Sequence, residues 1–419
     1  MSLPPEALRL RLHLLENLEQ GIIPFWSPRA VDAECGGYLT NFDETGRALA
    51  CDEKYLNTQC RLLWWFSRLS RAYPEIEQFR RLAHLGRTFI VTHFWDAEHA
   101  GWRWKVRRGG SALDDAKIVY GQSFAIYALA EHALATGDKL SLSYAASTVG
   151  SLEVHAADSL HGGYLENFGA NWLPAGSGAG GGDRKGLDTH MHLMEALTTL
   201  YRASGAEAHR RQLVDLIALI TSRMIDPKSG CGLNQFDVAW NPIEAIAIDR
   251  TWNAEREGER PAKPLDTTSY GHNLELAWLL RDAVSSAKLD FAPYAGVYQR
   301  LVEHALERGL DVEHGGLYRD GLRDGGAVVL EKEFWQQAEG LLGLVDAYTA
   351  LGDRRFLDAA CSVWSFIERH MILPGLGEWR VLVTREGRPI DSNIGNPWKV
   401  SYHTGRALLE SAQRLGNTS

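Results

Sequence analysis

A short pattern recurs six times along this chain and constrains its fold more than any other feature. Each copy runs from an acidic residue to one or two glycines, which an aromatic residue or leucine follows; the last copy is degenerate. Because glycine permits tight turns and the residues after it alternate between apolar and polar, each copy predicts a turn and a short strand or hairpin. The copies occupy residues 32–42, 96–106, 158–168, 226–236, 311–321 and 374–383.

The stretches between the copies have the period of amphipathic helices, as in HMHLMEALTTLYRASG and FWQQAEGLLGLVDAYTALG. Aligned on the glycines at 37, 101, 163, 232, 316 and 377, each interval has room for two helices. Such pairs cannot cover their apolar faces alone, which favours closure into a ring. We predict an all-α fold, an (α/α)6 barrel of six helical hairpins with short β-strands in the connecting loops. A single catalytic domain would span residues 1–419, with an open solenoid as the alternative.

Composition narrows the functional class. The formal charge of −9 leaves no basic footprint for nucleic acid. Five scattered cysteines without a CxxC pair argue against a disulfide framework or a zinc knuckle, and favour the cytoplasm. The charged, amphipathic N-terminal run reads neither as a signal peptide nor as a membrane span. We therefore expect a cytoplasmic protein that binds neither nucleic acid nor membrane.

Two segments add length to the regular repeat. Residues 175–186 are rich in glycine and formally match the dinucleotide-binding pattern, but neither the strand nor the helix that this pattern needs is evident around them. Residues 245–269 form a largely polar insertion. Long loops in compact folds are often functional, so this insertion is either a lid or a passive surface excursion.

Polar residues cluster at the starts of the helices expected to face the barrel axis. If these helices all begin at one mouth, the cluster surrounds one cavity and suits proton transfer, with two histidines as acid and base. His272 and Glu275 lie on one helical face, so the carboxylate could orient the imidazole. A structural role is the alternative for each single residue. His190 and His192 diverge by about 200° on a helix, which argues against a metal site.

The chain also resembles a known family. The runs YGQSFAIYALAE, THMHLMEALTTLY, YGHNLELAWLL, KEFWQQAEGLLG and WKVSYHTGRALLE, in this order and over nearly the whole chain, look like the N-acylglucosamine 2-epimerase superfamily. This superfamily includes cellobiose and mannose 2-epimerases and aldose–ketose isomerases acting on mannose-type sugars. The resemblance implies an (α/α)6 barrel, in agreement with the repeat count.

The resemblance also implies roles for particular residues. Arg61 matches an arginine that binds the sugar near its C1 and C2 oxygens, and His192 matches a histidine associated with ring opening. His272 and His403 match two general acid/base histidines, and Glu275 matches the carboxylate that partners His272.

Further positions are expected to bind the substrate. Tyr120, Trp335 and Trp398 stand where the family has sugar-contacting aromatic residues, and Asp188 and His190 open the third inner helix. Two departures from cellobiose 2-epimerases, Asp188 in place of asparagine and Phe334–Trp335 in place of a tryptophan pair, leave disaccharide specificity open.

We therefore predict a sugar epimerase that interconverts C2 epimers of an aldose through an enediol, without cofactor or metal and with a small sugar as its partner. A homodimer is the assembly we expect. An aldose–ketose isomerase using the same histidines is the close alternative. A glycoside hydrolase or lyase on the same barrel is a more distant one, since hydrolysis needs two flanking carboxylates. A sugar-binding protein without catalytic activity is the third.

Overall fold

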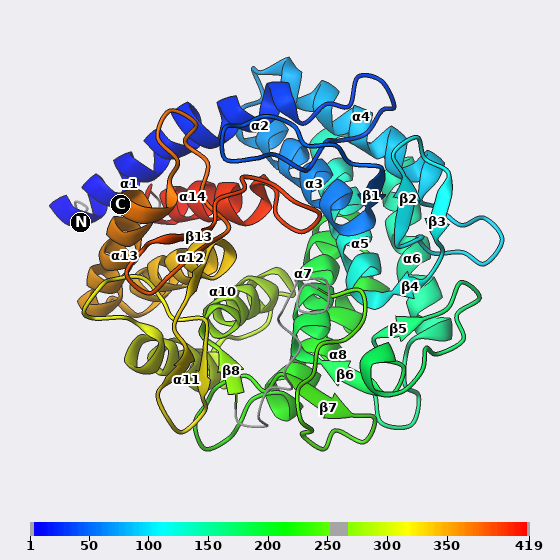
Figure 1. The fold of residues 1–419 in the computed structure, drawn as a ribbon. Coiled ribbons are helices and arrows are strands. Elements are labelled where there is room, and N and C mark those ends of the chain that lie inside the picture. The colour runs from blue at the N-terminus through cyan, green and yellow to red at the C-terminus, as the bar shows by residue number, and fades with distance from the viewer. Residues whose placement is uncertain (1–3, 252–266, 417–419) are drawn as a thin grey trace.

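The computed structural model describes residues 4–251 and 267–416, and its helices form two concentric rings (Figure 1). The inner helices are α3 (Leu56–Ala72), α5 (Val119–Thr136), α7 (Leu187–Ser204), α10 (Tyr270–Ser286), α12 (Phe334–Leu351) and α14 (Ser401–Gly416). The outer ring contains α1 (Pro5–Asn17), a π-helical turn (Leu18–Ile22), α2 (Ile23–Arg29), α4 (Glu77–His93), α6 (Lys139–His155), α8 (Glu207–Arg223), α11 (Ala292–Gly309) and α13 (Arg354–Phe366), the last followed by a π-helical turn (Ile367–Met371). The predicted (α/α)6 barrel is confirmed.

The ring closes through both ends of the chain. Each inner helix packs against the next, and α14 packs against α3. The outer helix α1 lies against α14, so the first and last helices form the sixth hairpin (Figure 1). Closure of this kind covers the apolar faces that an open solenoid would leave at its two ends.

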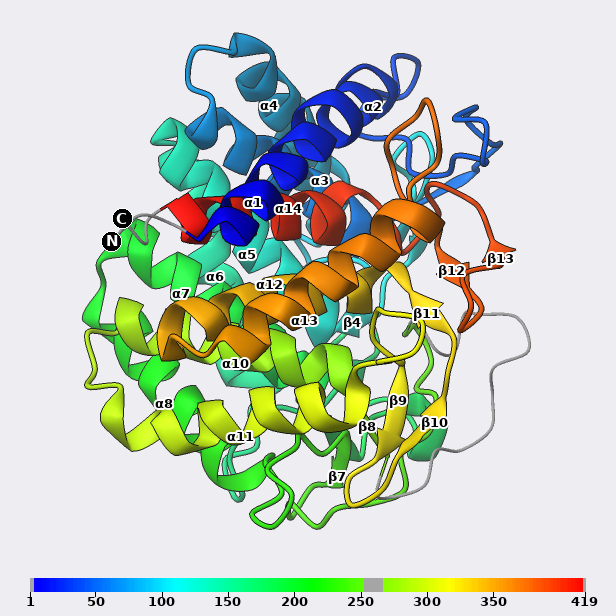
Figure 2. The same cartoon turned by 90° about the vertical axis from the view of Figure 1, so that its left-hand side faces the viewer.

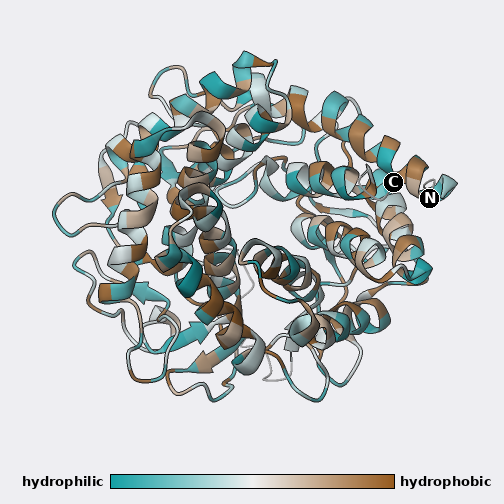
Figure 3. Ribbon diagram, turned by 180° about the vertical axis from the view of Figure 1, so that it is seen from behind, coloured by the Kyte–Doolittle hydropathy of each residue, from teal (hydrophilic) through white to brown (hydrophobic). Residues whose placement is uncertain are grey.

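Inner and outer helices differ in how much of their surface is buried. Along α12, residues 336–347 are all buried, as expected for a helix packed on every side. Along α8 only Leu213, Leu216, Ile217 and Ile220 are buried, one stripe at helical spacing. Figure 3 shows hydrophobic and hydrophilic residues alternating along the outer helices, as the two faces of an amphipathic helix do.

Short antiparallel strands gather at one end of the barrel (Figure 2). The strand before each inner helix pairs with the hairpin of the next copy: β1 with β2, β4 with β5, β6 with β7, β8 with β9, and β11 with β12. A bridge between Phe42 and Gly395 joins the last copy to the first. The strands are β1 (Glu53–Tyr55), β2 (Lys105–Arg107), β3 (Ala112–Asp114), β4 (Lys117–Ile118), β5 (Asn167–Phe168), β6 (Arg184–Gly186), β7 (Gln235–Asp237), β8 (Thr267–Ser269), β9 (Asp320–Leu322), β10 (Ala327–Val329), β11 (Lys332–Glu333), β12 (Leu382–Val383) and β13 (Pro389–Asp391).

The repeated turn has the same geometry in all six copies. A backbone bridge joins residues seven apart: Val31–Tyr38, Trp95–Trp102, Ala157–Tyr164, Ile225–Gly232, Leu310–Leu317 and Ile372–Trp379. Gly232 therefore occupies the position of Tyr38, one residue later than the alignment on glycines had it, and Cys231 stands where the first copy has Gly37. The alignment was wrong there because the left-handed conformation earlier in the turn belongs to Gly230 (φ 78°), the equivalent of Gly36 (φ 79°). It was also wrong in the last copy, where Gly377 (φ 76°) is the equivalent of Gly36 and Glu378 that of Gly37.

A buried ion pair ties four of these turns to the strand before the inner helix. The aspartate after the first bridge residue receives a lysine ammonium at 2.7 to 3.0 Å, in the pairs Asp32–Lys54, Asp96–Lys117, Asp158–Lys185 and Asp311–Lys332. In the degenerate last copy Lys399 pairs with Glu378 instead. These buried ion pairs, here called clasps, hold the segments that contain the lysines at a fixed place on the rim of the barrel. The starts of the inner helices that follow these segments are fixed with them.

None of the helices among residues 4–251 and 267–416 has the length and apolar character needed to cross a membrane.

Candidate active site

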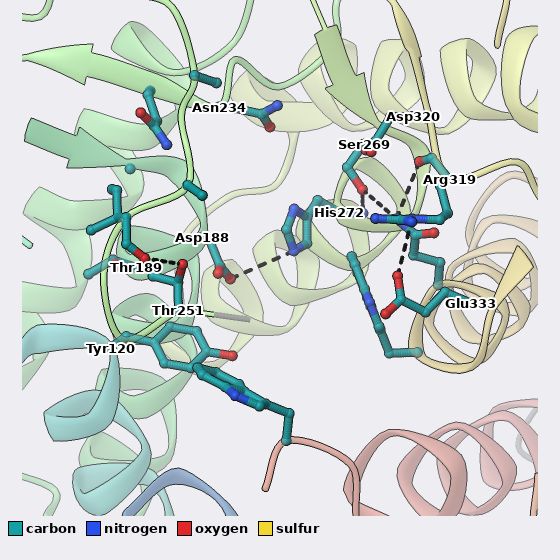
Figure 4. A pocket seen from close by; sticks show the side chains of 18 of the residues that line it. Tyr120, Asp188, Thr189, Asn234, Thr251, Ser269, His272, Arg319, Asp320 and Glu333 are labelled. Atoms are coloured by element: carbon teal, nitrogen blue, oxygen red, sulfur yellow. Dashed lines mark hydrogen bonds and ion pairs between the residues drawn. The ribbon is translucent and has the colours of Figure 1, made fainter. Parts of the chain in front are cut away.

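A cavity of about 490 Å³ opens at the strand end of the barrel, among the starts of the inner helices (Figure 4). Nine of the ten site residues expected from the sequence line it: Arg61, Tyr120, Asp188, His192, His272, Glu275, Trp335, Trp398 and His403. They come from all six inner helices or the turns just before them, as the common direction of these helices requires.

His190 does not belong to this set within the described chain. Its ring is fully buried, its Nδ1 lies 2.7 Å from the carbonyl oxygen of Gly186, and its Nε2 accepts the backbone N–H of Tyr164 at 3.0 Å. Gln59, Gln122 and Gln337 make the equivalent backbone contacts in other copies. The expectation that His190 binds substrate is wrong, since the residue holds its own turn in place.

His272 and His403 meet at the same aromatic side chain. The ring of Trp335 lies 4.6 Å from that of His272 and 6.0 Å from that of His403, centroid to centroid. Both imidazoles line the cavity, so the two predicted acid/base groups share one cavity. The indole of Trp335 forms part of its wall.

Carboxylates orient the histidines, but not in the expected pairs. Glu339 lies 2.7 Å from Nδ1 of His403, which leaves Nε2 as the nitrogen for proton transfer. Glu275 accepts a hydrogen bond from Arg406 at 2.6 Å, and its second oxygen has no hydrogen-bond partner in the described chain. The expected pairing of Glu275 with His272 is therefore replaced by one with Arg406.

Arg406 is the centre of a buried network whose pairings could not be predicted from the sequence. Its guanidinium donates to Glu195, Glu275 and Glu339, and Tyr402 donates to Glu195 at 3.0 Å. The sequence does carry a signal for it: Glu195 and Arg406 each lie three residues after a site histidine, hence one turn deeper on the same helical face.

His192 lies between two carboxylates. Its Nδ1 is 3.0 Å from Glu195, and its Nε2 is 3.2 Å from Asp188, whose same oxygen lies 3.7 Å from Nε2 of His272 (Figure 4 shows the latter contact). Burial alone would lower the pKa of His192, but the two carboxylates outweigh it and raise this pKa to about 10. His192 is therefore an imidazolium at neutral pH, a proton donor.

His403 has the opposite character. Burial, together with the positive charges of Arg61 and Arg406, holds the pKa of His403 well below its usual value, so the ring is neutral at pH 7. Burial and the nearby Glu339 raise the pKa of Glu275 to about 8, so Glu275 is largely protonated. The cavity thus contains a neutral imidazole beside a cationic one.

Arg61 is pinned in place beside these groups. It donates to the carbonyl oxygen of Trp398 and to the hydroxyl of Tyr120, each at 2.7 Å, and its guanidinium lies over the ring of Phe124 at 4.6 Å. A charge held so rigidly can stabilise an oxyanion without reorganising.

Among residues 4–251 and 267–416, one group of side chains has ligand atoms close enough for a metal ion: those of Glu275, Glu339 and His403 lie within 4.8 Å of one another. Arg406 donates to both of these carboxylates, so a cation there would have to compete with a guanidinium. The donor set suits a salt-bridge network better than a metal.

Comparison with known proteins decides the family. The sequence profile of the N-acylglucosamine 2-epimerase family matches residues 37–407. The chain belongs to this family. It is 30% identical to a cellobiose 2-epimerase of Bacteroides fragilis over 96% of the chain and 98% of that protein. It is 23% identical to a D-mannose isomerase of Marinomonas mediterranea over 96% of the chain and 97% of that protein. The structure of cellobiose 2-epimerase from Spirochaeta thermophila superposes with a TM-score of 0.85 at 30% identity, covering 98% of each chain.

The family identified from the sequence motifs is therefore confirmed, and with it the class of activity, carbohydrate epimerisation or isomerisation.

Proposed function

We propose that this enzyme interconverts the C2 epimers of a glucose- or mannose-type aldose by removing and returning the C2 proton. The observation that carries the proposal is the pair His272 and His403, which line one cavity and both lie against Trp335. Epimerisation needs a base on one face of C2 and an acid on the other, and each such group contributes about 10²–10⁴-fold.

The roles follow from protonation state. His192, as a cation, donates a proton to the ring oxygen as the C1–O5 bond breaks, and the ionised carboxylate of Asp188 takes the proton of the C1 hydroxyl, which leaves the open-chain aldehyde. His403, neutral and oriented by Glu339, takes the C2 proton through Nε2, and the electron pair moves onto the C1 oxygen to give a cis-enediolate. Arg61 stabilises that oxyanion. His272, which enters this step carrying the proton 3.7 Å from the Asp188 carboxylate, delivers it to the other face of C2 as the C1 carbonyl re-forms, while Tyr120, Trp398 and Asp188 hold the sugar.

An aldose–ketose isomerase would use the same groups and return the proton to C1. The 30% identity to a cellobiose 2-epimerase, against 23% to a D-mannose isomerase, favours C2 epimerisation. Hydrolysis needs two carboxyl groups that flank the scissile bond. It is disfavoured because one candidate, Glu275, accepts a hydrogen bond from Arg406.

Proton exchange in D2O tests the proposal. Cellobiose, mannose, glucose and N-acetylmannosamine are incubated with the enzyme, and the C1 and C2 protons are followed by NMR. Deuterium at C2 with an aldose product is expected; a ketose product would make the enzyme an isomerase, and no exchange in any sugar would refute both. His403→Ala should abolish exchange, and activity that survives chelation would agree with the predicted absence of a metal.

The cytoplasmic location and the homodimer expected from the sequence stay predictions.

A further inference from the structure

In the described chain, the start of α10, which carries His272, lacks the lysine clasp that fixes the other inner helices. In the five other copies a lysine stands two residues before the inner helix and pairs with a buried carboxylate of the turn. In the fourth copy this position is Thr268 of β8, and the carboxylate belongs to Asp226. Residues 252–266, the part of the long insertion that precedes β8, lie outside the described residues. The fourth copy therefore fixes its helix start by other contacts.

The clasp lysine does more than pair with a carboxylate. Lys54 also donates to the carbonyl oxygen of Arg108 at 3.1 Å, and Lys185 donates to that of Val238 at 2.7 Å. Arg108 and Val238 each directly follow the strand of the next copy, which pairs with the strand that contains the lysine. In these copies the lysine therefore joins three parts: the turn, the start of the inner helix and the hairpin of the next copy.

His304 makes the corresponding contact to the next hairpin in the fourth copy. It lies on α11, which packs against α10 and reaches β9 (Figure 2). Its Nε2 donates to the carbonyl oxygen of Arg323 at 3.0 Å. Arg323 directly follows β9, the strand paired with β8, so its carbonyl group is the equivalent of those of Arg108 and Val238. An outer helix thus supplies the donor that a strand supplies in the first and third copies.

The same buried imidazole contacts the first turn of α10. Its ring stacks on that of Tyr270, with the centroids 5.9 Å apart and the ring planes at 28°. Because its Nε2 is the donor to the hairpin, its Nδ1 accepts from the amide of Asn273, at 3.5 Å. Asn273 also accepts the N–H of Gly232 in the turn at 2.9 Å and donates to Thr268 at 3.1 Å. His272 stands between the two contact residues in sequence.

The carboxylate of Asp226 is held from the solvent side instead of by a buried ammonium group. It accepts hydrogen bonds from the backbone and the hydroxyl of Ser229 at 2.8 and 2.6 Å, and the guanidinium of Arg323 lies 3.6 Å away. The side chain of Arg323 is 34% exposed, whereas each clasp lysine is at most 4% exposed. Such an exposed pair contributes little. His304 therefore makes the contacts that place the helix.

We propose that His304 is a positioning residue for the reaction: it replaces the clasp lysine in the fourth copy and, through Tyr270 and Asn273, sets where His272 stands in the cavity. This rests on the proposed function, in which His272 delivers a proton to C2. A residue that acts by fixing His272 affects one half of the reaction, because removal of the C2 proton by His403 does not need it.

Proton exchange in D2O separates the two halves. With the epimer whose C2 proton faces His403, the enzyme removes this proton, exchanges it with solvent and returns a deuteron to the same face, which gives labelled substrate without inversion. Inversion needs His272 on the other face. The ratio of labelled substrate to product epimer therefore reports the position of His272, whereas a general loss of structure lowers both.

Three variants of the contact test the proposal. His304→Leu removes the donor and should raise this ratio about tenfold or more, with a fall in kcat and little change in KM, because a misplacement of about 1 Å costs about 10²-fold. His304→Gln keeps an N–H donor and should stay within about threefold of the wild type. His304→Leu combined with Thr268→Lys supplies the ammonium group of the other copies, and should return the ratio to within about threefold of the wild type.

His132→Leu is the matched control. His132 is also buried, and its Nδ1 bonds to the hydroxyl of Ser141 at 2.9 Å. It lies near the end of α5 that is remote from the cavity. The variant loses a buried imidazole and one hydrogen bond, as His304→Leu does, and should leave the ratio of labelled substrate to product unchanged.

Amide hydrogen exchange gives a readout that does not need turnover. Exchange over residues 270–276 should be faster in folded His304→Leu, with residues 334–340 of α12 unchanged, and Thr268→Lys should reverse the change. If the wild type epimerises no sugar, the proposed function fails and this exchange alone decides whether His304 fixes the helix start. An unchanged ratio in an active His304→Leu enzyme, unchanged exchange over residues 270–276, or an equal effect in His132→Leu overturns the proposal.

Discussion

Replacing Asp188 by asparagine should move the titration of His192. The Asp188 carboxylate oxygen lies 3.2 Å from Nε2 of His192, and it contributes to the raised pKa of about 10. The substitution keeps the size of the side chain and removes its charge. Glu195 stays at Nδ1, while Tyr120 and Phe124 of α5 pack against the ring and Glu275 approaches from α10.

The size of the shift follows from the distance. Unit charges 3.2 Å apart attract by about 1.3 kcal/mol in water and about 5 kcal/mol at an effective permittivity of about 20. The side chain of Asp188 is 45% exposed, but the oxygen that faces His192 is buried, so the loss lies between these two limits. A loss of about 1.4–2.7 kcal/mol corresponds to one to two pKa units. The pKa of His192 should fall to between about 8 and 9.

The direction in which stability changes with pH follows from the linkage between protonation and folding. A histidine with a raised pKa stabilises the fold fully below its ordinary value and loses that contribution as pH rises through its folded value. Between pH 6.5 and about 10 the wild type should therefore lose more stability than the variant. The alkaline limb of kcat/KM, where the imidazolium loses its proton, should shift to lower pH by the same one to two units.

NMR titration of the imidazole resonances, with His192 assigned through His192→Gln, measures the shift directly. Asp183→Asn is the matched control: its side chain is also 45% exposed, but it bonds to the N–H of Gly178 instead of a histidine. An unchanged His192 titration in Asp188→Asn would refute the electrostatic argument, and so would an equal shift in the control.

Three more substitutions test the site and its frame. His190→Gln should retain most of the activity, because glutamine makes the same backbone contacts in three other copies; loss of proton exchange with the fold intact would return His190 to the site. Lys117→Met removes the ammonium group at 2.7 Å from Asp96 but leaves Arg103 and two backbone N–H groups on this carboxylate, so it should cost about 1.5–3 kcal/mol in urea unfolding, and a cost under about 1 kcal/mol would show that the clasp is dispensable. Glu339→Gln should lower kcat by about 10²–10⁴-fold with little change in KM, because His403 loses its orienting acceptor; an unchanged kcat would refute that role.

The fold was predictable because it is periodic. Six copies of one turn, separated by helical stretches, leave few arrangements other than a closed ring. The clasp between Asp96 and Lys117 was not predictable, since the two residues are 21 apart in sequence and only the pairing of strands brings them together. The errors in the fourth and last copies arose because Cys231 and Glu378 stand, without a left-handed backbone, at a position that is a left-handed glycine in the other four copies.

The site was predictable in its location but not in its pairings. Helix starts that share a direction must meet, and this placed His272 and His403 in one cavity. Which carboxylate contacts which histidine depends on the packing of neighbouring helices. Glu339 on α12 contacts His403 on α14, a pair 64 residues apart in sequence. Glu275, only three residues from His272, contacts Arg406 instead. Spacing along one helix says nothing about such contacts.

One rule of helix geometry divides the inner helices between support and chemistry. Gln59, Gln122, His190, Asn273 and Gln337 each bond to the turn of their own copy, facing outward. Residues two positions later point about 200° away, toward the barrel axis. In the same order these are Arg61, Phe124, His192, Glu275 and Glu339, and Arg406 holds the corresponding place in the last copy. In each copy the turn holds the outward-facing residue by a hydrogen bond, and this residue in turn fixes the rotation of its helix. The ring of side chains on the axis, charged or ionisable at every position except Phe124, is therefore aligned by contacts outside the cavity.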